Sequence, residues 1–219
     1  MFTHRRTPIC PTRWTTRPAR TALLAVGCLM SLAMMVGAGP ALAASPEEER
    51  LAQALRQGGV VVLIRHAATH PGVGDPPGFV LADCSTQRNL SEGGRDQARR
   101  MGQWFAVHGI RPKSVRVSPW CRTRETATLA FGRSADWVPL SNLLHGRGNQ
   151  AEHAAQVDAA IRHVQAGAVD VMVSHGVTIS AFVGVYLQQG EMVAVRPIPG
   201  TDSTAGKPTV EVIGQLLVP

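Results

Sequence analysis

The stretch VVVLIRH, residues 60–66, decides how this 219-residue chain folds. Five consecutive β-branched or apolar residues follow Gly58 and Gly59, and such a run predicts a strand that is buried on both faces. Both faces of such a strand must be covered, which is typical of a mainly parallel sheet with helices on either side. Arg65 and His66 end the strand at the edge where sheets of this kind bind ligands.

Outward from this strand, helical and strand patterns alternate. Apolar residues at helical spacing, polar caps and glycine stops predict helices over 46–57, 91–108, 122–131, 149–166 and 178–187. Short apolar runs predict strands over 114–118, 169–174, 192–198 and 209–217. Between the first strand and the helix that begins at Ser91, residues 67–89 are rich in Pro and Gly and predict a long irregular loop. We therefore expect an α/β fold, a three-layer α/β/α sandwich around a mainly parallel sheet.

Residues 1–43 have the composition of a secretory signal peptide. Five arginines and no acidic residue precede the apolar run 23–36, and small residues end in Ala41-Leu42-Ala43. We expect cleavage after Ala43, which leaves residues 44–219 as one domain in the periplasm or outside the cell. An uncleaved membrane anchor is the alternative, but the apolar run is shorter than the ~20 residues that a membrane span needs. We expect no stable membrane insertion once the leader is removed.

Removing the leader changes the charge of the chain. Five of the 22 Lys and Arg residues lie in the leader, so 17 remain against 15 Asp and Glu residues. The high isoelectric point therefore largely describes the leader and does not favour nucleic-acid binding, which needs basic residues clustered on one face.

The same cut leaves two cysteines, Cys84 and Cys121. In an oxidising compartment two such cysteines can pair, and we expect a disulfide between them. Two buried free thiols are the alternative.

Polar clusters follow three of the predicted strands. Arg65-His66, Ser118 to Arg122, and Ser174-His175-Gly176 come directly after strands that the sequence pattern makes parallel. Because the carboxyl ends of parallel strands meet at one edge, two histidines and two arginines are expected to converge there. Arginine binds a phosphate dianion with paired hydrogen bonds, and neighbouring arginines favour the neutral, nucleophilic form of histidine. These residue types suit phosphoryl transfer.

The motifs resemble those of the histidine phosphatase (phosphoglycerate-mutase-like) superfamily. The segment RHAAT at 65–69 is similar to its Arg-His-Gly-x-Ser/Thr signature, and 118–127 to its second-arginine segment. The segment 89–98 resembles its Leu-Ser/Thr-x-x-Gly-x-x-Gln-Ala helix start, and 174–176 its second-histidine segment. These motifs occur in the family's order and span nearly all of residues 44–219.

The resemblance implies roles for individual residues. His66 is expected to be the phosphate-accepting nucleophile, with Arg65, Arg122 and His175 holding the phosphoryl group. Thr69 is expected to add a hydroxyl hydrogen bond. The family works without a metal ion or other cofactor, so we expect none.

Two positions depart from the family's pattern. Ala67 replaces the usual glycine, which we expect the backbone to tolerate unless φ is positive there. Asn142 stands where many relatives have a glutamate that protonates the leaving group. Glu152 is the first acidic residue after Asn142, and we name it as the candidate general acid. Its alternative role is a helix-dipole residue in solvent, and Asp75 and Asp83 are the further candidates.

The interpretation that these residues favour is an exported phosphatase, active on a small phosphorylated substrate such as a cell-envelope sugar phosphate. A mutase is disfavoured because export separates the protein from glycolytic intermediates. A phosphate-binding module that has lost catalysis is the second hypothesis, because of Asn142. A metal site at His66 and His70 is the third, but Pro71 makes that segment a loop and not a helix. Arg88 and Arg147 lie in loops from which they could reach a substrate, and neither is assigned a role.

Overall fold

The computed structural model describes residues 45–72, 74–145, 149–200 and 210–218. All of them fall in the second of two units, 42–219. The predicted signal peptide, residues 1–43, lies outside the described residues, as does Arg147. None of the helices in the described residues is long and apolar enough to cross a membrane.

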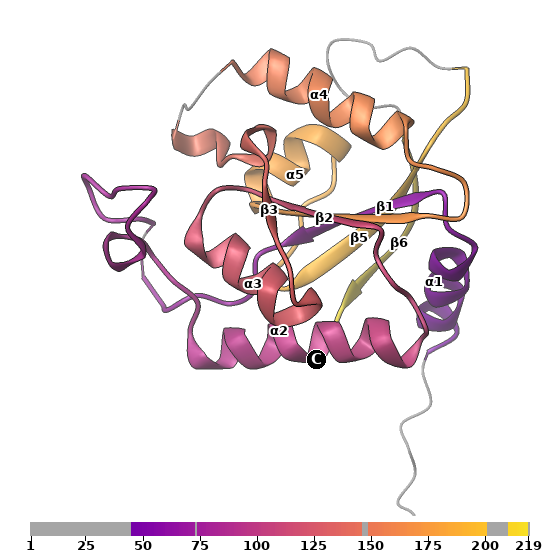
Figure 1. Ribbon diagram of the computed structural model, residues 1–219, viewed down its shortest axis with the longest axis horizontal. Helices are drawn as coiled ribbons and strands as arrows, with labels where there is room; N and C mark the ends of the chain where they lie inside the picture. Colours follow the sequence, from indigo (N-terminus) through magenta and orange to yellow (C-terminus); the bar gives the residue numbers. More distant parts are fainter. Residues whose placement is uncertain (1–44, 73, 146–148, 201–209, 219) are drawn as a thin grey trace, which may run out of the picture. The chain divides into compact units, whose positions relative to one another are not determined.

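Six strands form one sheet, in the order β3-β2-β4-β1-β5-β6 (Figure 1). The strands are β1 Val60–Arg65, β2 Ser114–Val117, β3 Ala135–Asp136, β4 Val169–Ser174, β5 Glu191–Pro197 and β6 Val210–Leu217. Strands β1 to β4 are mutually parallel, while β5 pairs antiparallel with both β1 and β6. The predicted mainly parallel sheet is confirmed.

Helices cover both faces of this sheet. They are α1 Pro46–Gln57, α2 Glu92–Val107, α3 Cys121–Phe131, α4 Gln150–Arg162 and α5 Gly176–Val183, with short 3-10 turns at Cys84–Thr86, Val138–Leu140 and Leu143–His145. Side chains of α1, α2 and α3 pack in one core cluster, and those of α4 and α5 pack in another. Figure 1 shows the two groups on opposite sides of the sheet. The predicted three-layer α/β/α sandwich is therefore confirmed.

The burial of β1 explains why its sequence is continuously apolar. Val60, Val62 and Ile64 contribute to the core that faces α1, α2 and α3. Val61 and Leu63 contribute to the core on the α4 and α5 side. Since successive side chains of a strand point to opposite faces, a strand covered on both sides needs apolar residues at every position.

The element boundaries match the sequence patterns with local differences. Helix α4 ends at Arg162 and not at 166, because the chain turns through Gly167 (φ 75°) before β4. Helix α5 begins at Gly176 and ends where Gly184 adopts the left-handed conformation. Strand β3 was not predicted, since its two residues are exposed and have no apolar alternation.

Candidate functional site

The carboxyl ends of three parallel strands bring the predicted residues together. Arg65 at the end of β1 pairs in register with Ser174 at the end of β4, and Val117 of β2 pairs with Val173. The next residues along these strands are His66, His175 and Ser118. The three polar clusters therefore share one edge of the sheet, as their positions after the strands predict.

His66 is held as a neutral imidazole with one ring nitrogen engaged. Its side chain is buried, with 2% of its surface exposed, and Nδ1 lies 2.9 Å from the backbone oxygen of Ala67. A proton on Nδ1 makes this contact a hydrogen bond, and Nε2 then keeps its lone pair. Burial lowers the pKa of His66 to about 3, and the positive charges of Arg122, Arg65 and Arg88 act in the same direction. The ring is therefore unprotonated at neutral pH.

His175 lies beside His66 at the end of β4. The two ring centroids are 5.5 Å apart in an edge-to-face arrangement. Nε2 of His175 is 2.8 Å from the Ser118 hydroxyl, and Nδ1 is 3.5 Å from an Arg122 guanidinium nitrogen. Each of these neighbours comes from a different segment, so the orientation of His175 depends on the tertiary fold.

Arg122 is almost completely buried and is paired with Asp75. Its Nη1 and Nη2 donate to Oδ1 and Oδ2 of Asp75 at 2.7 and 3.1 Å. Burial opposes ionisation of Asp75, but hydrogen bonds from Arg122, the Arg88 amide and the Trp120 indole outweigh it, so the pKa of Asp75 is lowered. Asp75 is therefore an ionised partner of the arginine and a poor proton donor at neutral pH.

Arg65 is positioned by the segment that follows α5. Its Nη1 donates to the Leu187 carbonyl at 2.8 Å and to the Tyr186 hydroxyl at 3.3 Å. Gly176 packs against this side chain, since a methyl group there would lie 3.2 Å from Nη1. Glycine in the second-histidine segment thus leaves room for the guanidinium.

The start of α2 supports the backbone beside His66. Ser91 caps the helix through Gly94, as predicted, and its amide and hydroxyl both donate to the Ala68 carbonyl. A Cβ added at Gly94 would stand 1.8 Å from that same oxygen. The Ala67 methyl is buried against Leu90 and Ala98, so the structure accommodates the replacement of glycine at this position.

A small cavity of about 80 Å³ lies at this edge. It is lined by four of the predicted site residues and by six others: Arg65, His66, Arg122 and His175, with Arg88, Asn142, Leu144, Gly176, Val177 and Tyr186. Drug-sized ligands need pockets of roughly 300 Å³ or more. The cavity thus has room for a phosphoryl group, while a larger leaving group would lie against the exposed rim.

Two predicted residues lie elsewhere among the described residues. Glu152 is exposed in the first turn of α4, where it accepts a hydrogen bond from Gln156. The hydroxyl of Thr69 accepts from Gln189 at 3.3 Å. Neither belongs to the described cavity lining, and their roles stay predictions. Asn142 does line the cavity, and its Oδ1 accepts from the Leu144 amide.

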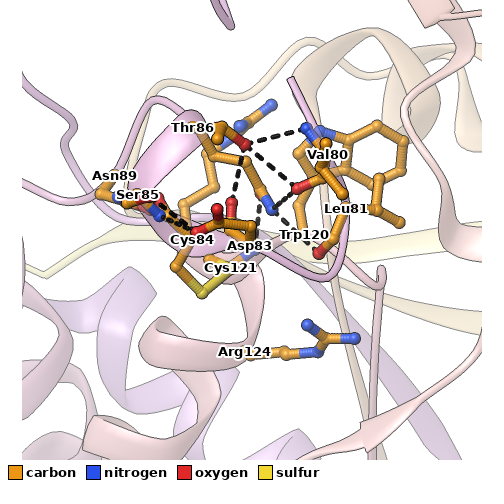
Figure 2. Close-up of a disulfide and its surroundings, with 12 residues drawn as sticks. Val80, Leu81, Asp83, Cys84, Ser85, Thr86, Asn89, Trp120, Cys121 and Arg124 are labelled. Carbon is orange, nitrogen blue, oxygen red and sulfur yellow. Dashed lines mark hydrogen bonds between the residues drawn. A yellow bond between two sulfur atoms is a disulfide. The ribbon is translucent and has the colours of Figure 1, made fainter. Parts of the chain in front are cut away.

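The disulfide between Cys84 and Cys121 is present, with an S–S distance of 2.04 Å. Figure 2 shows it joining the loop around Asp83 and Ser85 to the start of α3. Because Arg122 is the next residue after Cys121, the bond connects the long loop directly to the arginine segment. His70 lies in that loop and is exposed, so it does not form a helical pair with His66.

Sequence reasoning did not identify the roles of Asp75 and Arg88. Asp75 was a secondary candidate for the general acid, whereas the structure pairs it with Arg122. Arg88 had no assigned role, whereas it lines the cavity. The usable signal was their place in the long loop after His66, but a loop conformation cannot be read from composition.

Residues 61–144 match the family model of the histidine phosphatase superfamily, branch 1. Comparison with curated proteins gave no match. Among solved structures, the chain is similar to the protein histidine phosphatase SixA complexed with tungstate, at 17% identity and a TM-score of 0.50, covering 72% of this chain and 96% of that one. At that identity the likeness shows the fold alone.

Two further solved structures are similar at lower TM-scores. One is a candidate phosphohistidine phosphatase SixA from Agrobacterium tumefaciens, at 19% identity and a TM-score of 0.48, over 72% of this chain and 97% of that one. The other is a candidate α-ribazole-5′-phosphate phosphatase from Escherichia coli K-12, at 16% identity and a TM-score of 0.48, over 71% and 95%. Residues 61–144 are thus similar to branch 1 of the histidine phosphatase superfamily, and they lie within the six-stranded sheet fold described above.

Proposed function

We propose that this chain is an exported phosphatase that hydrolyses phosphate monoesters without a metal ion, through a phosphohistidine on His66. One observation carries the proposal. His66 is buried, neutral and bound through Nδ1 to the Ala67 carbonyl, and it lines a cavity together with Arg65, Arg122 and His175. This arrangement leaves Nε2 as the nucleophile among positively charged donors.

The reaction proceeds in two displacements. Nε2 of His66 attacks phosphorus, the ester P–O bond breaks, and the leaving oxygen takes its electron pair and a proton. Water then attacks the phosphohistidine, which releases inorganic phosphate and restores the imidazole. Arg65, Arg122 and His175 bind the phosphoryl oxygens, whose negative charge they stabilise through both steps.

The source of the leaving-group proton separates this proposal from the second candidate function. Asn142 lines the cavity, and no carboxylate does so among the described lining residues. This favours a phosphate-binding module as the alternative, or a substrate whose leaving group needs no proton. Glu152 remains our proposed acid. Glu152→Gln should slow alkyl phosphate hydrolysis at least about tenfold and leave nitrophenyl phosphate hydrolysis nearly unchanged.

Export and substrate class are further parts of the proposal. The basic, apolar and small-residue regions of 1–43 support a cleaved leader, and export supports a cell-envelope sugar phosphate as substrate. Thr69 is proposed to assist substrate binding through its hydroxyl. Amino-terminal sequencing of the mature protein should begin at Ala44, and an intact amino terminus on the exported protein would contradict cleavage.

The decisive experiment traps the covalent intermediate. Rapid quenching during turnover should find an acid-labile, base-stable phosphate on His66, and His66→Ala should lose both the adduct and turnover while it keeps the native circular dichroism spectrum. Activity should survive excess EDTA. Activity that disappears with chelator and returns with zinc or magnesium, or an active His66→Ala variant, would reject the mechanism. Phosphate binding without any turnover would favour the binding module.

A further inference from the structure

We infer that Arg88 is a third phosphate-binding guanidinium, which contacts the same phosphoryl group as Arg65 and Arg122. The identity of the ligand, a phosphoryl group, rests on the proposed function, whereas the choice of Arg88 rests on the structure. Arg88 comes from the long loop and lines the cavity together with the two arginines of the sheet edge. Among the positively charged residues in the described lining, Arg65 and Arg122 belong to the sequence motifs quoted above, whereas Arg88 does not.

All three arginines have the same unsatisfied donor. The Nε atoms of Arg65, Arg88 and Arg122 are buried, and none has a hydrogen-bond partner within the part of the chain that the structure describes. A buried donor without a partner is costly, and native structures rarely keep one unless a ligand or water satisfies it. All three arginines line one cavity, and the protein does not satisfy all of their donors, so their guanidinium groups favour an anion there.

The pairing of Arg122 with Asp75 reduces the positive charge available at the cavity. Asp75 takes one hydrogen bond from each terminal nitrogen of Arg122 and cancels one positive charge. Arg65, Arg88 and Arg122 against Asp75 leave a formal charge of about +2 beside neutral His66, which matches a phosphate dianion. Without Arg88 the charge would be about +1, and the dianion would be incompletely neutralised.

The backbone of Arg88 is bound to this same ion pair. Its amide donates to Oδ1 of Asp75 at 2.9 Å, and its carbonyl accepts from Nη1 of Arg122 at 3.4 Å. The preceding residue, Gln87, accepts from the Cys121 amide at 3.0 Å. The loop is therefore attached to α3 on both sides of the disulfide, and Arg88 is placed before a ligand arrives. Preorganisation of this kind reduces the entropy lost on binding.

Arg88 also influences the nucleophile. Its charge is one of those that lower the pKa of His66, after burial and the charges of Arg122 and Arg65.

The test measures oxyanion binding separately from turnover. Arg88→Met keeps an unbranched side chain that reaches about as far as Nε but has no charge, and Arg88→Lys keeps the charge without the planar donors. Arg111→Met is the control, because Arg111 is exposed and lies outside the described cavity lining. Titration calorimetry with tungstate and steady-state kinetics with nitrophenyl and alkyl phosphates are measured for each variant, together with the melting temperature.

Arg88→Met should bind tungstate at least about tenfold more weakly, the loss typical of a charge-assisted hydrogen bond, and Arg88→Lys should fall between it and the wild type. The catalytic efficiency kcat/KM should fall by the same factor for both substrates, because their phosphoryl groups are identical. Arg111→Met should change neither quantity. Unchanged tungstate binding by Arg88→Met would overturn the inference, as would a loss confined to one leaving group.

The outcomes distinguish the inference from the proposed function. A wild-type protein that binds tungstate but never forms phosphohistidine would reject the proposed mechanism, while the calorimetry still reports on Arg88. A wild-type protein that forms phosphohistidine, with an Arg88→Met variant that binds and turns over normally, would reject Arg88 alone. No tungstate binding by the wild type would reject both.

Discussion

Replacing Asp75 with asparagine tests the buried ion pair on which the arginine site depends. The side chains of Arg122 and Asp75 are 1% and 0% exposed, and two hydrogen bonds of 2.7 and 3.1 Å join them. An asparagine side chain at this position would have nearly the same shape but no charge. Asp75→Asn therefore leaves the Arg122 charge buried with one amide oxygen as its only acceptor at that position.

The expected loss of unfolding free energy in Asp75→Asn follows from the burial of the ion pair. Removing one partner of a buried pair typically costs about 3–5 kcal/mol, because the remaining charge stays desolvated without compensation. Since asparagine keeps one acceptor, we expect the lower end, about 3 kcal/mol. For a domain of 150–250 residues each kcal/mol shifts the melting temperature by roughly 2–4 °C, so the decrease should be about 6–12 °C.

Asp136→Asn is the matched control. Asp136 pairs with Arg124, two residues after Arg122 on α3, with an Nε–Oδ1 distance of 2.7 Å, but these side chains are 44% and 34% exposed. An exposed pair contributes at most about 1 kcal/mol. The decrease in melting temperature, measured by calorimetry at pH 7, should therefore be clearly larger for Asp75→Asn than for Asp136→Asn. Equal decreases for the two variants would refute the argument that burial makes the Asp75 pair special.

The stability difference between the wild type and Asp75→Asn should also depend on pH. The pKa of Asp75 is lowered in the folded chain from its ordinary value of 3.8, so the unfolded chain binds the proton more readily. Its stabilising effect is complete above about pH 4 to 5 and is lost as the pH falls through the lowered folded pKa. The difference in stability between the wild type and Asp75→Asn should thus shrink below pH 4. A difference that stays constant into acid would contradict this assignment.

Three further predictions concern the nucleophile and its support. Gly94→Ala should destabilise the protein by at least about 1–3 kcal/mol and reduce activity, because its methyl carbon would stand 1.8 Å from a backbone oxygen. Gly93→Ala is the control and should do neither, since no atom lies within 4 Å of its added methyl carbon. Equal melting temperatures and activities for the two variants would contradict this. The ring of His66 should remain neutral by NMR down to about pH 4. The stabilising effect of the neutral ring should be lost as the pH falls from 6.5 toward 3, because the unfolded chain binds the proton first. A His66 titration midpoint near pH 6.5 would reject the effect of burial. The denatured, unreduced protein should contain no free thiol from Cys84 or Cys121. Reduction of the disulfide should lower the free energy of unfolding by ~3–4 kcal/mol, according to the chain-entropy model for this 37-residue separation. Two free thiols in the unreduced protein would reject the bond.

The sequence by itself determined the layers of the fold and which of the predicted residues meet at one edge of the sheet. The run at 60–64 is β-branched or apolar at every position, which is typical of a strand covered on both faces, and β1 has that environment. Arg65, His66 and His175 follow strand ends, where parallel pairing brings them to one edge without knowledge of any loop. The pairing of Cys84 with Cys121 followed from a count of two cysteines.

The tertiary structure alone decided how the site is charged and held. That Asp75 pairs with Arg122 depends on the path of an irregular loop, and loop conformation is set by long-range contacts and not by periodicity. The position of Arg88 depends on that same loop and on its hydrogen bond to Asp75. The low pKa of His66 arises first from burial, which is a property of the packed chain around the ring. Residue types could show which chemistry was available, whereas burial and loop geometry determine which charges remain at this edge of the sheet.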